Sequence, residues 1–244
     1  MKIKGPAAPE QKDDGFARER RRIQAAYEKR ARNGSDLRDS LLHPYALFLE
    51  QERERALVAL LRQAGIRTLA GLRILEVGCG EGRPLRRLLD YGAQARRLVG
   101  VDLLANRVHA ARRNNPALAW LCAEGAVLPF PDGSFDLVTQ GTVFTSVLDP
   151  RYRLTMAGEI VRVLRPGGKL LWYDFFYDNP RNPDVRRVGK AELRALFPGF
   201  RLAIRRVTVA PPLGRALPAW PLLYDCLAAL RIFSSHYLCL GEKP

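Results

Sequence analysis

The residues best suited to chemistry in this sequence surround a glycine-rich turn. The stretch ILEVGCGEGRP (residues 74–84) is an apolar run that leads into glycines at positions 78, 80 and 82, with Glu76 two residues before the first. The apolar run predicts a buried strand, and glycines directly after a strand let the backbone approach a ligand closely. Such a turn can bind a dinucleotide, a nucleoside triphosphate or a nucleoside without phosphates.

The composition of the turn discriminates among these three ligands. The dinucleotide fingerprint G-x-G-x-x-G requires a third glycine at the position of Arg83. A P-loop requires Gly-Lys-Ser or Gly-Lys-Thr, which the turn lacks. Glu76 would repel a pyrophosphate, whereas it suits a cationic ligand. The turn therefore favours a phosphate-free adenosine that carries an amino-acid tail.

Polar residues at the ends of later predicted strands complete a nucleoside site. In an open parallel sheet, ligands bind beyond the carboxyl ends of the strands. Asp102 ends the second strand and can accept both ribose hydroxyls, and Leu103 behind it can pack on an adenine face. Glu124, with the backbone of Gly125, can read the adenine edge, and Gln140 ends the fourth strand. These features match S-adenosylmethionine, an adenosine with a sulfonium and an amino-acid tail.

Four motifs make the chain resemble the class I S-adenosylmethionine-dependent methyltransferases, in particular the broad bacterial group similar to ubiquinone-biosynthesis enzymes. The motifs are LEVGCGEG (75–82), VGVD (99–102), LPFPDGSFDLV (128–138) and LRPGGKLLWYDF (164–175). The resemblance covers residues 72–176 and implies S-adenosylmethionine as cofactor and S-adenosylhomocysteine as product. It further implies that Glu76, Gly78, Cys79 and Gly80 line the methionine side and that Asp102 binds the ribose.

The whole chain also resembles a group of bacterial methyltransferases in which QERER (51–55) precedes the core and WYDF (172–175) precedes an NP-x-NP loop. This resemblance names no acceptor. Within QERER, Arg53 and Arg55 could reach the cofactor carboxylate, but we expect them on a solvated helix face.

The catalytic residues are less defined than the cofactor site. Methyl transfer from a sulfonium mainly requires alignment and exclusion of water, and a general base helps only an acceptor such as a hydroxyl. Asp174, near the end of the fifth strand, is a candidate for binding the acceptor or for the base, with a structural role as the alternative. His236 and His43 are weaker candidates for the base. His109, in the middle of a predicted helix, reads as structural.

Several other chemistries are excluded by what the sequence lacks. Enzymes that methylate amino groups of nucleic acids carry Asn/Asp-Pro-Pro-aromatic at the end of the fourth strand, where this chain reads TQGTVF (139–144). No cysteine stands there to serve carbon methylation of cytosine. Because no carboxylate set or zinc-type spacing occurs, we predict no metal.

Alternating strand and helix patterns predict an α/β protein: a Rossmann-like, doubly wound, mostly parallel seven-stranded sheet with an N-terminal helical extension. Residues 1–15 are expected to be a disordered tail, 16–70 a helical cap, and 71–244 the methyltransferase domain, with 177–234 contributing a lid over the acceptor site. The RPGG stretch (165–168) reads as a break between helix and strand. The apolar stretch within 211–233 could be part of this lid or an ordinary packing helix.

The predicted elements are these: helices at 16–33, 44–65, 84–92, 105–114, 152–164 and 190–197, and strands at 72–78, 97–102, 119–124, 135–140, 169–176, 201–210 and 236–243.

The charge is the unusual part of the composition. The chain has 40 basic and 25 acidic residues, a net charge of +15, and its basic residues are mostly arginines spread along the sequence. A positive field favours anionic partners, although dispersed arginines also suit solvated helix faces. We therefore expect methyl transfer to a small-molecule, sugar or lipid-linked acceptor, with oxygen as the preferred target. An RNA methyltransferase and a non-catalytic cofactor-binding subunit remain the alternatives.

Other features of the sequence indicate the cellular compartment in which the protein is expected. Four scattered cysteines fit a reducing, cytoplasmic environment, and the N-terminal residues have no apolar core that would predict a signal peptide. No apolar run is long enough for a transmembrane helix, but peripheral contact with a membrane stays open. The sequence does not indicate an oligomeric state.

Overall fold

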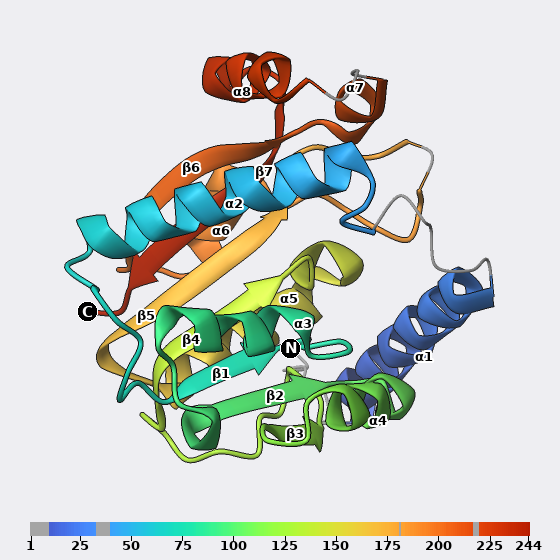
Figure 1. Ribbon diagram of the computed structural model, residues 1–244. Coiled ribbons are helices and arrows are strands. Elements are labelled where there is room, and N and C mark those ends of the chain that lie inside the picture. Colours follow the sequence, from blue (N-terminus) through green and yellow to red (C-terminus); the bar gives the residue numbers. More distant parts are fainter. Residues whose placement is uncertain (1–9, 33–39, 181, 217–219) are drawn as a thin grey trace, which may run out of the picture.

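Alternating apolar strands and amphipathic helices build one seven-stranded sheet with the strand order β3-β2-β1-β4-β5-β7-β6 (Figure 1). Strands β1 to β5 are mutually parallel, whereas β7 runs antiparallel to both β5 and β6. This is the predicted mostly parallel doubly wound architecture, closed at one edge by an antiparallel hairpin. The computed structural model describes residues 10–32, 40–180, 182–216 and 220–244, with side chains from residue 15 onward.

The strands are β1 (Ile74–Val77), β2 (Leu98–Asp102), β3 (Ala119–Cys122), β4 (Phe135–Gly141), β5 (Leu164–Phe175), β6 (Arg201–Val209) and β7 (Ser234–Glu242). The helices are α1 (Glu10–Arg32), α2 (Pro44–Gln63), α3 (Arg83–Arg87), α4 (Ala105–Asn114), α5 (Pro150–Val163), α6 (Lys190–Leu196), α7 (Pro211–Ala216) and α8 (Pro221–Leu230). Short 3₁₀ helices lie at η2 (Leu88–Tyr91), η3 (Ala95–Arg97) and η4 (Phe144–Ser146).

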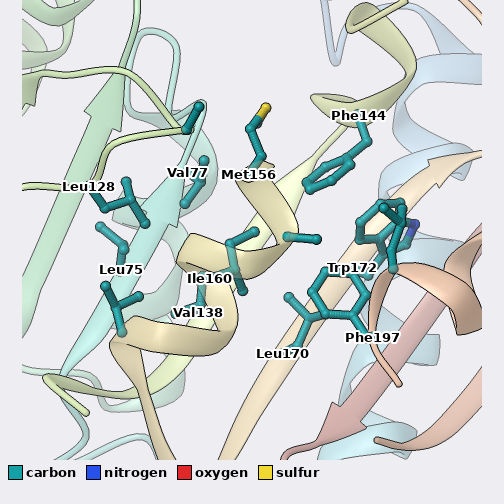
Figure 2. Packing of buried hydrophobic residues seen from close by; sticks show 14 of the residues in the cluster. Leu75, Val77, Leu128, Val138, Phe144, Met156, Ile160, Leu170, Trp172 and Phe197 are labelled. Carbon is teal, nitrogen blue, oxygen red and sulfur yellow. The ribbon is translucent and has the colours of Figure 1, made fainter. Parts of the chain in front are cut away.

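Strand residues alternate between two hydrophobic cores because successive side chains point to opposite faces of a sheet. On one face Leu75 and Val77 pack with Met156 and Ile160 of α5, and the same core continues to Trp172 of β5 (Figure 2). On the other face strand residues pack with α2, α3 and α4; this second core includes Ile74, Leu98, Leu137, Leu60, Leu61, Leu85 and Val108. Glu76 lies between Leu75 and Val77 in β1, so its side chain points to the face covered by α2 and α3.

Two expected boundaries were wrong. The tail predicted as disordered over 1–15 falls partly outside the described residues, but α1 already begins at Glu10. The RPGG stretch also does not break β5, which starts at Leu164. Here a bulge shifts the register against β4, and Gly167 and Gly168 pair with Lys243.

The predicted N-terminal cap does not behave as one unit. Helix α2 packs on the sheet through the buried Leu60 and Leu61, and Figure 1 shows it lying along β7 and β6. Helix α1 instead lies beside the end of α4, where the two helices line a common cleft. One helix is therefore part of the core, and the other covers the carboxyl edge of the sheet.

The segment between β6 and β7 forms two short helices, α7 and α8, where the sequence predicted one apolar helix. Tyr224 is the only residue of α8 that is buried. None of the helices in the described parts of the chain has the length and apolar character that a membrane span requires.

Candidate functional site

The turn after β1 is shaped by its glycines and fixed by Asp102. Gly78, Gly80 and Gly82 adopt positive φ angles of 71°, 54° and 84°, a region that side chains other than glycine rarely occupy. A Cβ at Gly78 would meet the Val143 side chain at 2.3 Å. The Asp102 carboxylate accepts the backbone N–H of Gly80 at 2.8 Å through Oδ2 and that of Leu104 at 2.9 Å through Oδ1. The turn and the end of β2 are thus one rigid unit.

An apolar cavity of about 70 Å³ lies on the β2 side of this turn. Asp102, Leu103 and Gly125 line it from the sheet edge, and their binding of the cofactor stays a prediction. Ile23 and Tyr27 of α1 close it from above, and Tyr27 places its hydroxyl 3.2 Å from Ser146 Oγ. We call this space the α1 cavity.

A second cavity, of about 90 Å³, lies beneath α2; its lining is also largely apolar but includes several polar side chains. Its lining includes Glu76, Gln140, Arg53 and Tyr173, and the Arg53 guanidinium lies 5.3 Å from the centre of the Tyr173 ring. Within the described chain, Glu76 Oε2 and Gln140 Nε2 are buried without a hydrogen-bond partner. Such groups are costly unless a ligand or water satisfies them. We call this space the α2 cavity.

The electrostatics of the α2 cavity centre on Glu76. Burial raises the pKa of its carboxyl to about 8, against the opposing effects of the Leu85 backbone N–H and the Arg53 guanidinium. The Arg53 side chain also donates to Glu50 Oε2 at 2.8 Å. A cationic group that entered this cavity could bind Glu76 in its ionised form, whereas the unpartnered Gln140 Nε2 is a donor and suits an anionic group.

Two of the residues predicted to bind the cofactor, Cys79 and Glu124, line neither the α1 cavity nor the α2 cavity. Cys79 is buried under the turn, its Sγ lies 3.7 Å from the Gly80 carbonyl oxygen, and burial raises its thiol pKa. Glu124 lines neither cavity, because its carboxylate pairs with Arg20 of α1 at 2.7 Å and bonds the Tyr152 hydroxyl. The role of Glu124 in binding adenine stays a prediction. To bind adenine, its carboxylate would have to give up the ion pair with Arg20 of α1.

Asp174 is fully buried at the end of β5. Its carboxylate accepts the Thr145 hydroxyl at 2.5 Å and the backbone N–H of Thr145 and of Phe175 at 3.3 and 3.1 Å. Burial raises its pKa to about 7, although these hydrogen bonds oppose the shift. These hydrogen bonds attach η4 to the end of β5, and Asp174 lines neither cavity.

The two histidine candidates lie apart from each other. The His236 ring stacks on Tyr173 with centroids 4.5 Å apart, and its Nδ1 lies 2.8 Å from Ser235 Oγ. Burial lowers the pKa of His236 to about 3, with a further contribution from Arg53, so the imidazole is neutral. His43 is the N-cap residue of α2 and lines neither cavity. Through Tyr173, His236 is the candidate base nearest the α2 cavity.

The prediction that Arg53 and Arg55 both lie on a solvated helix face is correct for Arg55 and wrong for Arg53. Arg55 lies on an exposed helix face and pairs with Asp225, as expected. Arg53 instead lines the α2 cavity opposite Glu76. The two arginines are two positions apart on a helix and so face different directions, which periodicity alone could have indicated. Ile23 and Tyr27 also line the α1 cavity, which was not predicted because no local sequence pattern says that α1 folds back over the turn.

A large open cleft of about 1430 Å³ adjoins the turn between α1, α3 and α4. Arg30 and Arg107 flank the Tyr27 ring at 4.8 and 4.9 Å from its centre, and Arg83 and Arg86 line the opposite side. In the described parts of the chain these four arginines have no carboxylate partner, although Glu28 and Glu81 also line the cleft. Across the same residues, no cluster of His, Cys, Asp and Glu has the arrangement of a metal site.

Comparisons with known proteins agree with this geometry. Residues 75–172 match the family model described as a methyltransferase domain. A demethylmenaquinone methyltransferase of Clavibacter sepedonicus is 31% identical over 157 residues, which cover 63% of this chain and 61% of the relative. A fatty-acid O-methyltransferase of Mycolicibacterium smegmatis is 39% identical over 106 residues, which cover 43% of this chain and 37% of the relative.

Solved structures show the same fold. The structure of an S-adenosylmethionine-dependent methyltransferase from Mesorhizobium loti matches with a TM-score of 0.56 at 20% identity, over 74% of this chain and 95% of that one. The chain spans about three fifths of the length of the first curated relative, 61%.

Proposed function

We propose that this chain, whose residues 75–172 match a methyltransferase-domain family model, is a class I, S-adenosylmethionine-dependent enzyme that transfers a methyl group to a small-molecule or lipid-linked acceptor, at an oxygen atom. The observation that carries this proposal is the pair of cavities on either side of the glycine turn. One contains a carboxylate suited to ribose hydroxyls, and the other a buried carboxyl suited to a cation.

The α1 cavity fits the adenosine end of the cofactor. Asp102 is already fixed by two backbone N–H groups, so it can accept ribose hydroxyls without reorganising. Leu103 and the backbone at Gly125 offer an apolar surface for the adenine. Because 70 Å³ is far below the several hundred Å³ of a typical ligand pocket, binding requires α1 to move outward.

The α2 cavity fits the amino-acid end. Glu76 Oε2 has no partner and would bind the α-amino group, Arg53 would bind the carboxylate, and Gln140 Nε2 would donate to it. Bound across both cavities, S-adenosylmethionine would supply an activated methyl group to the acceptor. Val143 packs against Gly78 between the cavities, so its side chain must yield to a ligand that spans them.

The acceptor would approach from the edge of the sheet where β5 ends and β7 begins. Tyr173 lines the α2 cavity on one side and stacks on His236 on the other. A neutral His236 can accept a proton, but a pKa near 3 makes it a weak base, so an acceptor with an acidic oxygen suits this site best. The acceptors named for two relatives, a demethylmenaquinone and a fatty acid, support an apolar acceptor, and the name of the second also specifies oxygen.

One observation favours a second candidate function. The cleft lined by Arg30, Arg83, Arg86 and Arg107 adjoins the turn and could bind phosphates of an RNA acceptor. Against this candidate, the sequence offers no recognised RNA-binding module. The large cleft therefore supports RNA only as the alternative acceptor.

The test separates these candidates by where a label goes. The protein is incubated with methyl-labelled S-adenosylmethionine and a bacterial extract that has been separated into lipid, RNA and soluble small-molecule fractions. We expect label in the lipid or small-molecule fraction, and none with Asp102→Ala. Label in RNA would overturn the proposal in favour of the alternative. Cofactor binding without label in any fraction would indicate a cofactor-binding subunit without its own activity.

A further inference from the structure

The segment between β6 and β7 exposes an unusual amount of apolar surface. Five large apolar side chains on or beside α8 have exposed fractions between 36% and 81%: Trp220, Leu222, Leu223, Leu230 and Ile232. We call them the α8 patch. A surface helix normally hides its apolar stripe against the core, yet the only buried residue of α8 is Tyr224. Exposed apolar side chains gathered on one element mark an interaction site.

The patch is held rigidly. The Tyr224 hydroxyl donates to Glu52 Oε2 at 2.8 Å, and the same carboxylate accepts the backbone N–H of Thr208 and of Val209 at 2.8 and 3.3 Å. The Tyr224 ring also packs near Tyr45 of α2. This buried Glu52 clasp fixes one side of α8 and leaves the apolar side chains pointing outward.

The patch lies at the edge of the sheet used by the candidate site. Strand β6 is antiparallel to β7, which is antiparallel to β5, so β6 ends at the same edge as the parallel strands. Figure 1 shows α7 and α8 outside β6, beyond the sheet. Glu52 of the clasp is followed directly by Arg53 of the α2 cavity, so the patch and the cavity are connected through adjacent residues of α2.

The charge around the patch is positive. Arg215 and Arg231 flank α8, and in the described parts of the chain neither has a carboxylate partner. Asp225 is the only acidic residue between positions 210 and 233, and Arg55 neutralises it. An apolar surface with an arginine rim and an exposed tryptophan suits the boundary between water and an anionic lipid layer.

A second copy of the chain fits the patch less well. A ten-residue helix is about 15 Å long, so it offers much less than the roughly 800 Å² per partner of a standard interface. The flanking arginines of two copies would also repel each other if the patches met face to face.

We propose that the α8 patch docks the protein on the surface of an anionic lipid bilayer, with the candidate site turned toward the source of a lipid-soluble acceptor. This inference rests on the proposed function for its purpose, but docking itself can be measured without any methyl transfer. Trp220 and the leucines would enter the interface, while Arg215 and Arg231 bind the headgroup phosphates.

The test uses the full chain and vesicles of phosphatidylcholine with 30% phosphatidylglycerol, compared with vesicles of phosphatidylcholine alone. We expect sedimentation with the anionic vesicles, and an at least tenfold weaker partition for the combined variant Leu222→Asn, Leu230→Asn and Ile232→Asn. A matched control, Val127→Asn with Leu154→Asn, changes side chains exposed to 69% and 59% on other elements and should bind like the unaltered protein.

Tryptophan fluorescence locates the contact. Trp120 and Trp172 are buried, so Trp220 is the tryptophan whose surroundings a vesicle can change. We expect a blue shift on anionic vesicles that Trp220→Phe abolishes while sedimentation persists. Equal partition of the α8 variant and the control would overturn the proposal, and so would a dimer in light scattering that the α8 variant abolishes. Cofactor affinity, measured by calorimetry without vesicles, tests the proposed function separately.

Discussion

The two cavities beside the glycine turn are similar in volume and in their mostly apolar lining, but they differ in their polar groups and in the helix that covers them. In the α1 cavity the Asp102 carboxylate is already hydrogen-bonded, and the covering helix packs on the core through Ile23 and adds the partly exposed ion pair of Arg20 with Glu124. The α2 cavity holds buried polar atoms without partners, and its cover is part of the hydrophobic core. Both cavities are far smaller than a typical ligand pocket, so both must widen to admit the cofactor, but only the α2 cavity holds polar atoms that wait for a partner.

The largest expected effect concerns the α1 cavity. Asp102→Ala removes the acceptor for two ribose hydroxyls, each worth about 1.5–3 kcal/mol to a charged group, so the affinity for S-adenosylhomocysteine should fall about 100-fold or more. Calorimetry measures the change. Asp132→Ala, which alters an exposed carboxylate paired with Arg162, is the matched control and should leave the affinity unchanged. Unchanged affinity of Asp102→Ala would refute the ribose assignment.

The two covers can be compared through one buried carboxylate in each. Glu52→Ala leaves three buried donors of β6 and α8 without an acceptor, so the free energy of unfolding should fall by about 3 kcal/mol in urea titrations. Glu19→Ala removes the acceptor for the Leu148 backbone N–H and an ion pair with Arg22 within α1. It should change global unfolding by less than about 1 kcal/mol, while hydrogen exchange of the α1 amides accelerates. Equal losses in the two variants would mean that α1 is as integral as α2.

The charged end of the α2 cavity is tested by Arg53→Met. Loss of one charge-assisted contact to the cofactor carboxylate should weaken binding about 10- to 30-fold, with little effect on the thermal midpoint. Arg55→Met is the control, because Arg55 lies two residues away and contacts only Asp225 at the surface. If both variants bind equally, the cofactor carboxylate is held elsewhere.

The smallest effect is a dependence on pH that arises from Glu76. With a pKa of about 8, its carboxyl is protonated at pH 6.5 and must ionise to bind an ammonium group, so binding should release close to one proton. Affinity should therefore rise with pH up to about 8, and calorimetry in buffers of different ionisation enthalpy should detect the proton. The Glu76→Gln variant should show neither effect. Identical heats in all buffers would contradict the assignment.

The same group also affects folding stability. Its pKa in the folded chain is above the value of about 4.3 expected in the unfolded chain, so between these values the folded state holds a proton that the unfolded state has lost. Its contribution to stability is therefore present at low pH and declines as pH rises from about 4 to about 8.

Local sequence predicted the parts of the molecule that depend on local rules. The glycine turn, the positions of Asp102 and Gln140 at strand ends and the seven strands follow from spacing, β propensity and the rules of parallel sheets. The prediction for Arg53 failed because it asked whether the residue was on a helix surface without asking which surface the sheet covers. The pairing of Glu124 with Arg20, 104 residues apart, is a tertiary contact that no local pattern encodes.

The segment between β6 and β7 shows a second limit of prediction from local sequence. The apolar composition of residues 211–233 correctly indicated helix, but composition could not tell a helix that packs inward from one that faces outward. That outcome depends on inward contacts of α8 with α2, chiefly the hydrogen bond of Tyr224 to Glu52 and the packing of its ring on Phe48.

The Glu52 clasp has a consequence for the order of events on the ribosome. Its backbone partners at Thr208 and Val209 are made 156 and 157 residues after Glu52 itself. At about 5–20 residues per second, roughly 8 to 30 seconds pass between the synthesis of Glu52 and that of the strand that donates to it. During that interval α2 can already pair with Arg87, but the side that packs on β6 and α8 lacks its native partners, so nascent chains stopped before residue 209 should be the form of this protein that depends most on chaperones.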